Sequence, residues 1–184
     1  MIIGVTGIIG SGKSTAAKLL AEHLHARVID ADELGHRVLA ENKFVRLGLR
    51  IVFGSLQRPE IAGQAFASPL KLFCLNKLTH PFIRRLIFRE LRQKNTSFIL
   101  DAPLLFPAGL AKYCDRIIFV TAREALLRRR LTAKGYTPAQ IKQRLSANRS
   151  VYKYQKQAVS LANNGTLAEL RRTICILFPK KGIF

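Results

Sequence analysis

Apolar and polar positions alternate along the chain in blocks that predict strands and helices in turn. Short, mostly apolar runs predict strands at Ile2 to Thr6, Arg27 to Asp30, Ser97 to Asp101, Arg116 to Val120 and Val159 to Leu161. Between them, apolar residues recur every three or four positions, which is the spacing of one helix face. This spacing predicts helices at Ser14 to His25, 33–53, 69–93 and 123–133, then from Thr137 with Pro138 first, and from Thr166 with a Thr166–Glu169 capping box.

This order of elements predicts the fold class. Strands that alternate with helices form an α/β fold, in which a parallel sheet is covered by helices on both faces. Such sheets bind ligands beyond the carboxyl ends of their strands. Candidate functional residues are therefore expected where strands end and helices begin.

The end of the first strand carries a phosphate-binding pattern. The segment Gly7 to Ser14 fits G-x-x-x-x-G-K-[ST] in full, between a strand and a helix. Glycines allow backbone N–H groups to approach phosphate oxygens, and the helix N-terminus favours an anion. Lys13 is placed to reach the β- and γ-phosphates, and the Ser14 hydroxyl to ligate Mg²⁺. The alternative is a glycine-rich turn without a ligand. The position between strand and helix favours a P-loop that binds a nucleoside triphosphate and donates its γ-phosphate to a small molecule.

Acidic residues end two further strands. In Asp30-Ala31-Asp32, one carboxylate is a candidate to accept a substrate hydroxyl proton or to hold a Mg²⁺-bound water. The alternative is that Asp32 caps the helix that follows. Asp101 ends the third strand, where P-loop proteins place a second acidic residue near Mg²⁺, although an apolar run followed by Asp is a common pattern.

Basic residues gather in the second half of the chain. The segment from Arg128 to Arg144 is basic and carries Gly135 between two helices. Arginines on a helical lid stabilise charge on a transferring phosphoryl group and exclude water. The alternative is a solvated helix face. His80-Pro81 is expected to lie between helical segments, and by physics alone this histidine is structural.

The net charge of +20, from 31 Lys and Arg against 11 Asp and Glu, favours binding to polyanions. The charge is spread over 84–94, 123–134 and 142–156. This spread predicts only non-specific electrostatic binding to nucleic acid, without a dedicated site.

Other features bound the class of protein. The apolar runs are too short to span a membrane, and the first residues lack the pattern of a signal peptide, so no membrane partner is expected. Cys74, Cys114 and Cys175 are far apart and show no metal-ligand or disulfide spacing. A reduced, cytoplasmic compartment is therefore expected.

Several short motifs follow one another between residues 2 and 170. They are Val5 to Thr15, Val28 to Asp32, Arg58, Phe66, Leu78 to Ile83, Pro103 to Phe106, Cys114 to Ile117, Arg144 and Asn163-Asn164-Gly165. In this order they resemble the dephospho-coenzyme A kinases. The resemblance implies ATP-dependent phosphorylation of the ribose 3′-hydroxyl of dephospho-coenzyme A, the last step of coenzyme A synthesis.

The resemblance also implies an organisation and a set of site residues. It implies one P-loop kinase domain with a core of about 1–32, 96–122 and 157–184, a helical substrate-binding insertion of about 33–95 and a helical lid of about 123–156. Asp32 is implied as the catalytic base beside Lys13. The residues implied for ATP are Gly10, Ser11, Gly12, Lys13, Ser14, Thr15, Arg144, Asn164 and Gly165. Those implied for the acceptor are Asp32, His80, Arg84 and Leu104, with Mg²⁺ at Ser14. A monomer is expected, and an oligomer is the alternative.

Some positions depart from the family pattern. A glycine is common where Ile8 stands, and the segment after Phe53-Gly54 looks shortened. Pro107, Ala133, Asn148 and Ala158 replace a usual glutamate, arginine, glutamine and acidic residue.

Two alternative functions follow from the sequence. One is a P-loop kinase for another small acceptor, such as a nucleoside or nucleoside monophosphate, and the region around His80-Pro81 argues against it. The other is a protein that has lost catalysis and binds polyanions. The basic surface favours this second alternative, while Gly12-Lys13-Ser14 and Asp32 oppose it.

Overall fold

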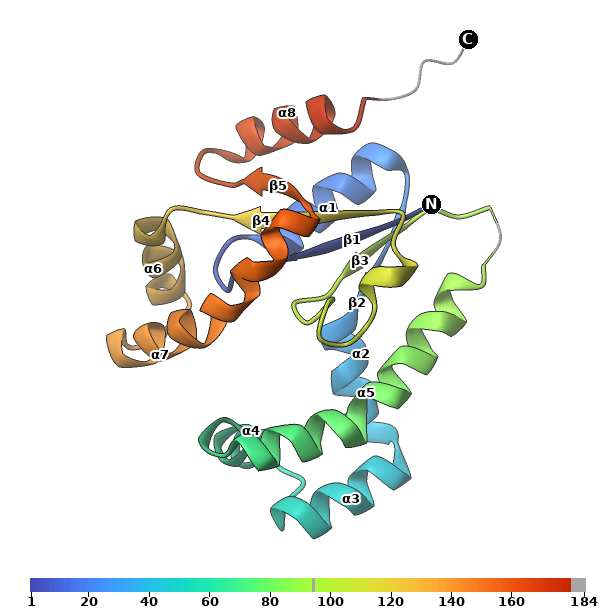
Figure 1. Ribbon diagram of the computed structural model, residues 1–184, viewed down its shortest axis with the longest axis vertical. Coiled ribbons are helices and arrows are strands. Elements are labelled where there is room, and N and C mark those ends of the chain that lie inside the picture. The colour runs from blue at the N-terminus through green and yellow to red at the C-terminus, as the bar shows by residue number, and fades with distance from the viewer. Residues whose placement is uncertain (94, 180–184) are drawn as a thin grey trace. The chain divides into compact units, whose positions relative to one another are not determined.

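Five strands form one sheet in the computed structural model, which describes residues 1–93 and 95–179 apart from the side chain of Phe66 (Figure 1). The sheet order is β2-β3-β1-β4-β5, and the pairs β1–β3, β1–β4 and β4–β5 are parallel. The strands are β1 (Ile2–Gly7), β2 (Arg27–Asp30), β3 (Phe98–Asp101), β4 (Arg116–Thr121) and β5 (Val159–Ala162). Each predicted strand is therefore confirmed to within one residue at either end, and the α/β fold class is confirmed.

Eight α-helices and two 3₁₀ helices occur among the described residues. They are α1 (Lys13–Leu24), α2 (Ala31–Glu41), α3 (Lys43–Phe53), α4 (Arg58–Ala67), α5 (Pro69–Leu91), η1 (Ala111–Tyr113), α6 (Glu124–Ala133), α7 (Pro138–Asn148), η2 (Arg149–Gln157) and α8 (Leu167–Leu177). The capping box predicted at Thr166 and Glu169 is confirmed, and Thr137 forms a second one with Gln140.

Three predictions about helices need correction. The helical stretch 33–53 is divided at Asn42, whose backbone is extended and whose side chain accepts from the N–H of Val45. The apolar spacing did not predict α4. His80-Pro81 lies inside the continuous helix α5 and not between two helical segments. Pro81 has no N–H, so it leaves one backbone hydrogen bond of α5 unmade.

The chain divides into two compact units. One comprises Met1–Ile29 with Lys94–Phe184, and we call it the sheet unit; the other, Asp30–Gln93, we call the helical unit. The Phe66 side chain, which the family resemblance includes, lies outside the described atoms of the helical unit.

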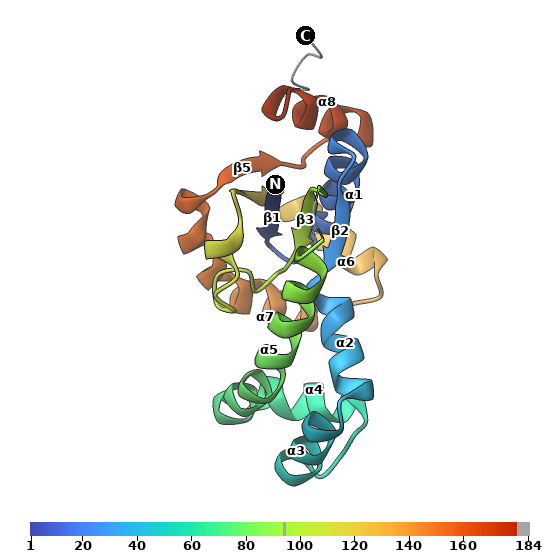
Figure 2. The ribbon, with the colours of Figure 1, turned by 90° about the vertical axis from the view of Figure 1, so that its right-hand side faces the viewer.

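The sheet unit has apolar layers on both faces of its sheet. Ile118 and Val120 of β4 pack with residues of α1 and α8, whereas Phe119 between them packs with Ile8 and Leu127. This follows from the alternation of side chains along a strand. Figure 2 shows α1 on one side of the strands and η2 on the other. Gly4 permits a close approach on β1, because a Cβ there would meet Leu105 Cδ2 at 2.7 Å.

The helical unit has its own apolar core. Its buried members come from α2, α3 and α4, and the partly buried Leu72, Leu75, Phe82 and Ile83 of α5 pack against them. Gly48 brings α3 close to α5, since a Cβ at this position would meet Leu78 Cδ2 at 2.6 Å. At Gly35 of α2, a Cβ would make an ordinary contact with Ile83 Cδ1 at 3.4 Å, so α2 and α5 also lie next to each other. This packing positions Asp32 on α2 and His80 and Arg84 on α5, three of the four residues predicted for the acceptor.

Candidate nucleotide-binding site

The loop between β1 and α1 adopts a backbone that requires glycine. Gly7, Gly10 and Gly12 have φ values of 141°, 79° and 87°. Residues with a Cβ rarely adopt such angles. A Cβ on Gly7 would also collide with the backbone oxygen of Val120, and one on Gly12 with the side-chain amide of Asn163. The glycines of the sequence pattern therefore meet a steric need.

The N-terminus of α1 differs from that of the other helices. Its cap residue is Gly12, which offers no side-chain hydrogen bond, and its first turn has no acidic residue. Of the α-helices in the described residues, only α1 lacks both features, because the others have a capping side chain or an acidic first turn. The first N–H groups of a helix need a partner, and the helix dipole favours an anion. The end of α1 is therefore suited to a phosphate group.

The polar side chains of the loop lie close to this helix end. Lys13 Nζ donates to the backbone oxygen of Ile8 at 3.2 Å, so the ammonium lies across the loop. Ser14 and Thr15 are exposed in the first turn of α1. Ser11 is fully buried, and within the described part of the chain its hydroxyl oxygen has no hydrogen-bond partner. A buried polar atom without a partner is costly, so a ligand atom at this loop would stabilise it.

Arg130 and Asn163 hold the loop from the side. The Arg130 guanidinium donates to the backbone oxygens of Ser11 at 3.2 Å and Gly10 at 3.5 Å, and to that of Asn163 at 3.0 Å. The Asn163 side chain, which is buried, donates to the Ser11 oxygen at 2.8 Å. These contacts join α6, the end of β5 and the phosphate loop into one network.

Asn164 and Gly165 support helix ends. Asn164 Oδ1 accepts a hydrogen bond of 2.7 Å from the N–H of Arg123, the residue that precedes α6. A Cβ on Gly165 would collide with the Glu169 carboxylate. That carboxylate accepts from the N–H of Thr166 at 2.7 Å and completes the capping box of α8. Both residues therefore have a structural role, in addition to the ATP binding that is predicted for them.

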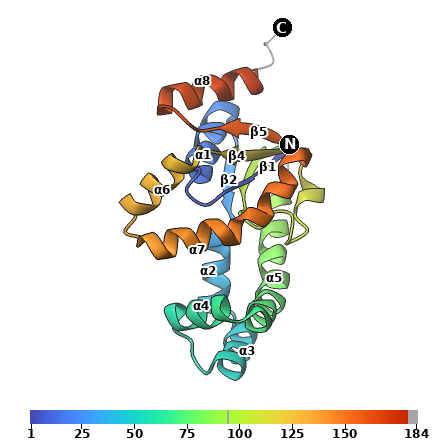
Figure 3. The same cartoon turned by 60° about the vertical axis from the view of Figure 1, so that its left-hand side comes forward.

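The helix α7 is also tied to the loop. Asn148 Oδ1 accepts from the N–H of Ile9 at 3.3 Å, and Asn148 Nδ2 donates to the backbone oxygen of Arg144 at 3.2 Å. The Arg144 guanidinium lies 4.5 Å from the centre of the Tyr136 ring, a cation–π contact. Figure 3 shows α6 and α7 side by side. The two helices of the predicted lid therefore contact the phosphate loop through Arg130 and Asn148.

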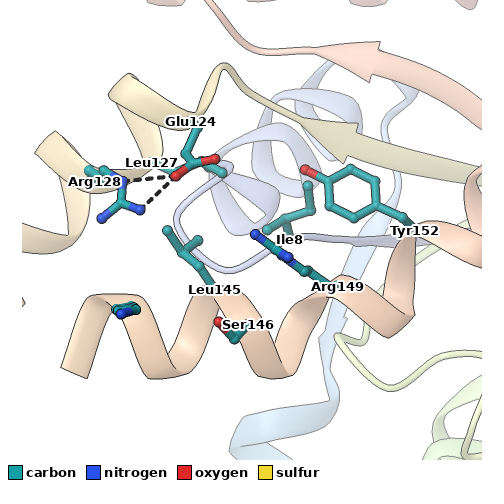
Figure 4. Close-up of a pocket in the computed structure, with 9 residues that line it drawn as sticks. Ile8, Glu124, Leu127, Arg128, Leu145, Ser146, Arg149 and Tyr152 are labelled. Atoms are coloured by element: carbon teal, nitrogen blue, oxygen red, sulfur yellow. Dashed lines mark hydrogen bonds and ion pairs between the residues drawn. The ribbon is translucent and has the colours of Figure 1, made fainter. Parts of the chain in front are cut away.

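A small cavity lies between Ile8, α6 and α7 (Figure 4). Its volume is about 180 Å³, and Leu127, Leu145 and Tyr152 line it. A cavity of this size holds several water molecules. Arg128 on its rim is paired with Glu124 at 2.6 Å.

Asp101 ends β3 beside the phosphate loop. It is 4% exposed, and in the sheet register it is the partner of Val5, two residues before Gly7. The described residues hold no cluster of three or more His, Cys, Asp or Glu that would form a protein-only metal site. Mg²⁺ is usually held by one or two protein oxygens together with substrate phosphates and water. The Ser14 hydroxyl and the Asp101 carboxylate fit that kind of site.

In the helical unit, Asp30 caps α2. Asp30 Oδ1 accepts from the N–H groups of Asp32 at 2.9 Å and Glu33 at 3.1 Å. The alternative in which Asp32 is the cap is therefore wrong, because the strand ends one residue before the helix begins and leaves the cap position to Asp30. Asp32 lies in the first turn of α2 with an exposed side chain.

His80 and Arg84 are one turn apart on α5. His80 is half-buried and Arg84 is exposed. Burial, and secondly the charge of Arg84, lower the pKa of His80 below its ordinary value. Neutral imidazole is therefore favoured. Gly35 of α2 faces Ile83, the neighbour of Arg84, so the first turns of α2 and this part of α5 belong to one packed layer. Leu104, 46% exposed, belongs to the sheet unit and follows β3.

The chain matches the family model of dephospho-CoA kinase over residues 1–169. It belongs to the dephospho-CoA kinase family. A dephospho-CoA kinase of Dehalococcoides mccartyi is 35% identical, over 98% of this chain and 96% of the relative. A crystal structure from Thermus thermophilus has a TM-score of 0.82 and 34% identity, covering 99% of this chain and 98% of the other. A dephospho-CoA kinase structure from Campylobacter jejuni has a TM-score of 0.68 and 25% identity, covering 96% and 94%. The protein is accordingly an ATP-dependent kinase, a transferase.

The residues that depart from the dephospho-CoA kinase pattern lie in different local environments. Ile8 is 1% exposed and fills the apolar cluster around Phe119, so this larger side chain has a packing role. Asn148 makes the contact with Ile9 described above. Pro107 and Ala133 are exposed. The half-buried Ala158 packs against the cluster around Phe119.

Two residues that contact the phosphate loop have no individual role in the sequence-based prediction. Asn163 contacts the phosphate loop through the Ser11 oxygen, whereas Asn164, which the family resemblance implies for ATP, accepts from the N–H of Arg123. Arg130 was one arginine of a basic segment. An alternation argument on β5 and its continuation could have found Asn163, because the buried Leu161 is two residues earlier on the same face.

Proposed function

We propose that this protein transfers the γ-phosphate of ATP to the ribose 3′-hydroxyl of dephospho-coenzyme A, giving coenzyme A and ADP. One observation carries the proposal. The glycine-rich phosphate loop leads into the N-terminus of α1, which has no side-chain cap. The same chain matches the dephospho-CoA kinase family model over residues 1–169.

ATP is proposed to bind at the phosphate loop. In this proposal the amides of Gly10, Ser11 and Gly12 donate to the phosphates. The Ser11 amide and the Lys13 ammonium, which both donate to the Ile8 oxygen in this structure, exchange that contact for phosphate oxygens. This exchange is favourable because a charge-assisted hydrogen bond is stronger than one to a neutral oxygen. Thr15, Arg144, Asn164 and Gly165 complete the proposed set.

Mg²⁺ is proposed to be held by the Ser14 hydroxyl, with Asp101 reaching it through water. When bound, the ion neutralises charge on the β- and γ-phosphates. The chain's own part is to position these oxygens. Ser14 does so from the first turn of α1, and Asp101 from the end of the adjacent strand β3.

The acceptor is proposed to bind to Asp32, His80, Arg84 and Leu104. Dephospho-coenzyme A carries a pyrophosphate, for which Arg84 is a suitable partner. His80 is favoured in its neutral form, so it offers the acceptor one N–H donor and one acceptor nitrogen. The helical unit is proposed as the substrate-binding part of the protein.

Asp32 is proposed as the base. A sugar hydroxyl is a weak nucleophile, so a carboxylate in hydrogen-bond reach orients it and takes its proton. Asp30 is a poorer candidate because one of its oxygens already accepts two backbone hydrogen bonds that cap α2. Phosphoryl transfer depends mostly on positioning and charge stabilisation, so the base need not be strong.

The helices α6 and α7 are proposed as a lid whose arginines stabilise the transferring group. Arg130 and Arg144 are the residues to expect there, since the first contacts the phosphate loop and the second lies one turn from Asn148. Gly135, with φ of 84°, lies between the two helices and is the proposed hinge.

No helix of the described residues is long and apolar enough to cross a membrane. A cytoplasmic monomer remains a prediction from the sequence.

The proposed function is tested by measuring ADP release with ATP and Mg²⁺. The acceptors are dephospho-coenzyme A, a set of nucleosides and a set of nucleoside monophosphates, each at several concentrations. We expect turnover with dephospho-coenzyme A to exceed that with every other acceptor. Faster turnover with a nucleoside or its monophosphate would assign another acceptor, and no turnover with any would favour the polyanion-binding alternative.

A further inference from the structure

Helix α3 carries apolar side chains on two sides. Val45, Leu49 and Phe53 are buried in the core of the helical unit. On another side, Phe44 and Ile51 are each 77% exposed and Leu47 is 60% exposed. Their spacing of three and four residues places Phe44, Leu47 and Ile51 in one line along the helix. We call these three residues the outer stripe.

The outer stripe needs an explanation that a single exposed leucine would not. Apolar residues scattered singly on a surface are normal, whereas a contiguous exposed set marks an interaction surface. Phe44, Leu47 and Ile51 stay 60–77% exposed, and none of them belongs to the apolar core that the described residues of the helical unit form. Burial inside the unit therefore does not account for these side chains.

Basic residues accompany the outer stripe. Lys43, Arg46 and Arg50 follow the same spacing, and α3 contains no Asp or Glu. At about 100° per residue, the outer stripe lies opposite the buried side, and the basic line lies on the flank between the two. Lys43 and Arg50 are exposed, and Arg46 is held by a hydrogen bond of 2.9 Å to the backbone oxygen of Ala40. The exposed part of α3 is thus both apolar and cationic.

The two properties together select one partner. In an antiparallel two-fold contact, a second copy of the chain would bring the two basic lines to the same side, where they repel each other. Nucleic acid offers phosphates, but its outer surface gives no apolar layer for Phe44, Leu47 and Ile51. An anionic phospholipid surface offers both, because acyl chains lie directly beneath charged headgroups.

We propose that α3 docks this protein reversibly on anionic phospholipid membranes. The outer stripe enters the boundary between headgroups and acyl chains, and Lys43 and Arg50 face the lipid phosphates. The proposal concerns a surface that the phosphoryl-transfer reaction does not use, and it differs from the sequence-based expectation of no membrane partner. No membrane-spanning helix is needed for such binding.

The test is sedimentation of the full chain with two kinds of vesicle. One contains phosphatidylcholine alone, and the other phosphatidylcholine with phosphatidylglycerol at about seven to three. We expect binding to the anionic vesicles at low salt, weaker binding in about 0.5 M salt because surface charges are screened, and little binding to the neutral vesicles. Replacing the outer stripe (Phe44→Ser, Leu47→Ser and Ile51→Ser together) should lower the partition coefficient at least about tenfold.

A matched control is Ile176→Ser, which removes an apolar side chain that is 71% exposed on α8 of the sheet unit. This variant should bind vesicles as the wild type does. The rate of ADP release in solution should stay near the wild-type rate for each variant. An unchanged rate shows that the variants fold. Loss of vesicle binding with activity intact supports the proposal independently of which acceptor the enzyme uses.

Other outcomes overturn the proposal. Absence of binding to anionic vesicles at low salt removes the membrane as partner. Binding that survives loss of the outer stripe, but not Lys43→Glu with Arg50→Glu, is non-specific electrostatics. A wild-type dimer that becomes monomeric in the outer-stripe variant, without vesicle binding, assigns the surface to a second copy of the chain.

Discussion

The two strand-to-helix junctions β1–α1 and β2–α2 have the same order of elements and opposite chemistry at the helix end. At α1 the cap is Gly12, without a side-chain acceptor. At α2 the cap is Asp30, whose carboxylate accepts from two backbone N–H groups. The first junction leaves its N–H donors to a ligand, whereas the second satisfies them internally and carries Asp32 on its exposed side. A helix N-terminus without a side-chain cap is suited to an anion, whereas a capped one is not.

The largest effect is expected at the first junction. Lys13→Ala removes the point charge from the phosphate loop and should lower turnover at least about a thousandfold, as loss of a charge-stabilising donor does. The melting temperature should change little, because Lys13 is half-buried at the start of α1 and its ammonium donates to a backbone oxygen, that of Ile8. ADP release and thermal unfolding by circular dichroism measure the two effects. Turnover near the wild-type rate would contradict the P-loop proposal.

The second junction separates capping from catalysis. Asp32→Asn keeps the shape of the side chain but cannot take a proton, so kcat should fall at least about a hundredfold with ATP affinity nearly unchanged. Asp30→Ala should instead lower the free energy of unfolding by about 1 kcal/mol, because it removes the cap of α2.

Asp30→Asn is the control for the assignment of the base. If Asp30→Asn loses kcat while Asp32→Asn retains it, the two roles are reversed. If both variants keep their kcat, the carboxylate-base mechanism is wrong for this protein.

A smaller effect is expected from the residue that holds the first junction. Arg130→Ala removes the hydrogen bonds to Ser11 and Asn163 and should raise KM for ATP roughly tenfold to a hundredfold. Arg128→Ala on the same helix removes only an exposed pair with Glu124 and should change KM by less than about threefold. Arg130→Lys should restore part of the loss, since it keeps the charge but not the planar fork. Equal KM values for Arg130→Ala and Arg128→Ala would remove Arg130 from the site.

His80→Ala and Arg84→Ala extend the comparison to the acceptor. Each variant should raise KM for dephospho-coenzyme A roughly tenfold, which is the effect expected when one charge-assisted hydrogen bond is lost. KM for ATP should rise much less. Initial rates with either substrate varied give both constants. An equal rise in both constants would argue against acceptor binding by these residues.

The smallest effect is the contribution of His80 to acid stability. Because the pKa of His80 is lowered in the folded protein, the unfolded chain takes up the proton first as the pH falls. Stability from this group is therefore complete above the unfolded pKa of about 6.5 and is lost progressively as the pH drops through the lowered folded value. Thermal unfolding of wild type and His80→Gln between pH 7.5 and pH 5 should show a shallower decline for the variant. Parallel curves would mean that His80 is not the group responsible.

Short-range patterns sufficed for much of the fold. The strands β1 to β5, the phosphate loop and the Thr166 capping box each depend on residues within one strand or one helical turn. Residues that are close in the sequence are then also close in the structure, so a local pattern predicts them. The resemblance to the dephospho-CoA kinases added the family, which the match over residues 1–169 shows. The sequence pattern did not predict α4, because Pro59 and Gly63 interrupt its apolar spacing.

Tertiary structure decided what depends on distant segments. Asn163 and Ser11 are 152 positions apart in the chain, and Arg130 and Ser11 are 119 apart, so no local pattern could pair them. The choice between Asp30 and Asp32 as the cap depended on a strand end fixed by hydrogen bonding to β3.

The sequence by itself determined that α3 is strongly apolar. Only packing decided that Val45, Leu49 and Phe53 are buried while Phe44, Leu47 and Ile51 remain exposed. Burial is a property of neighbours, which a helix periodicity cannot name.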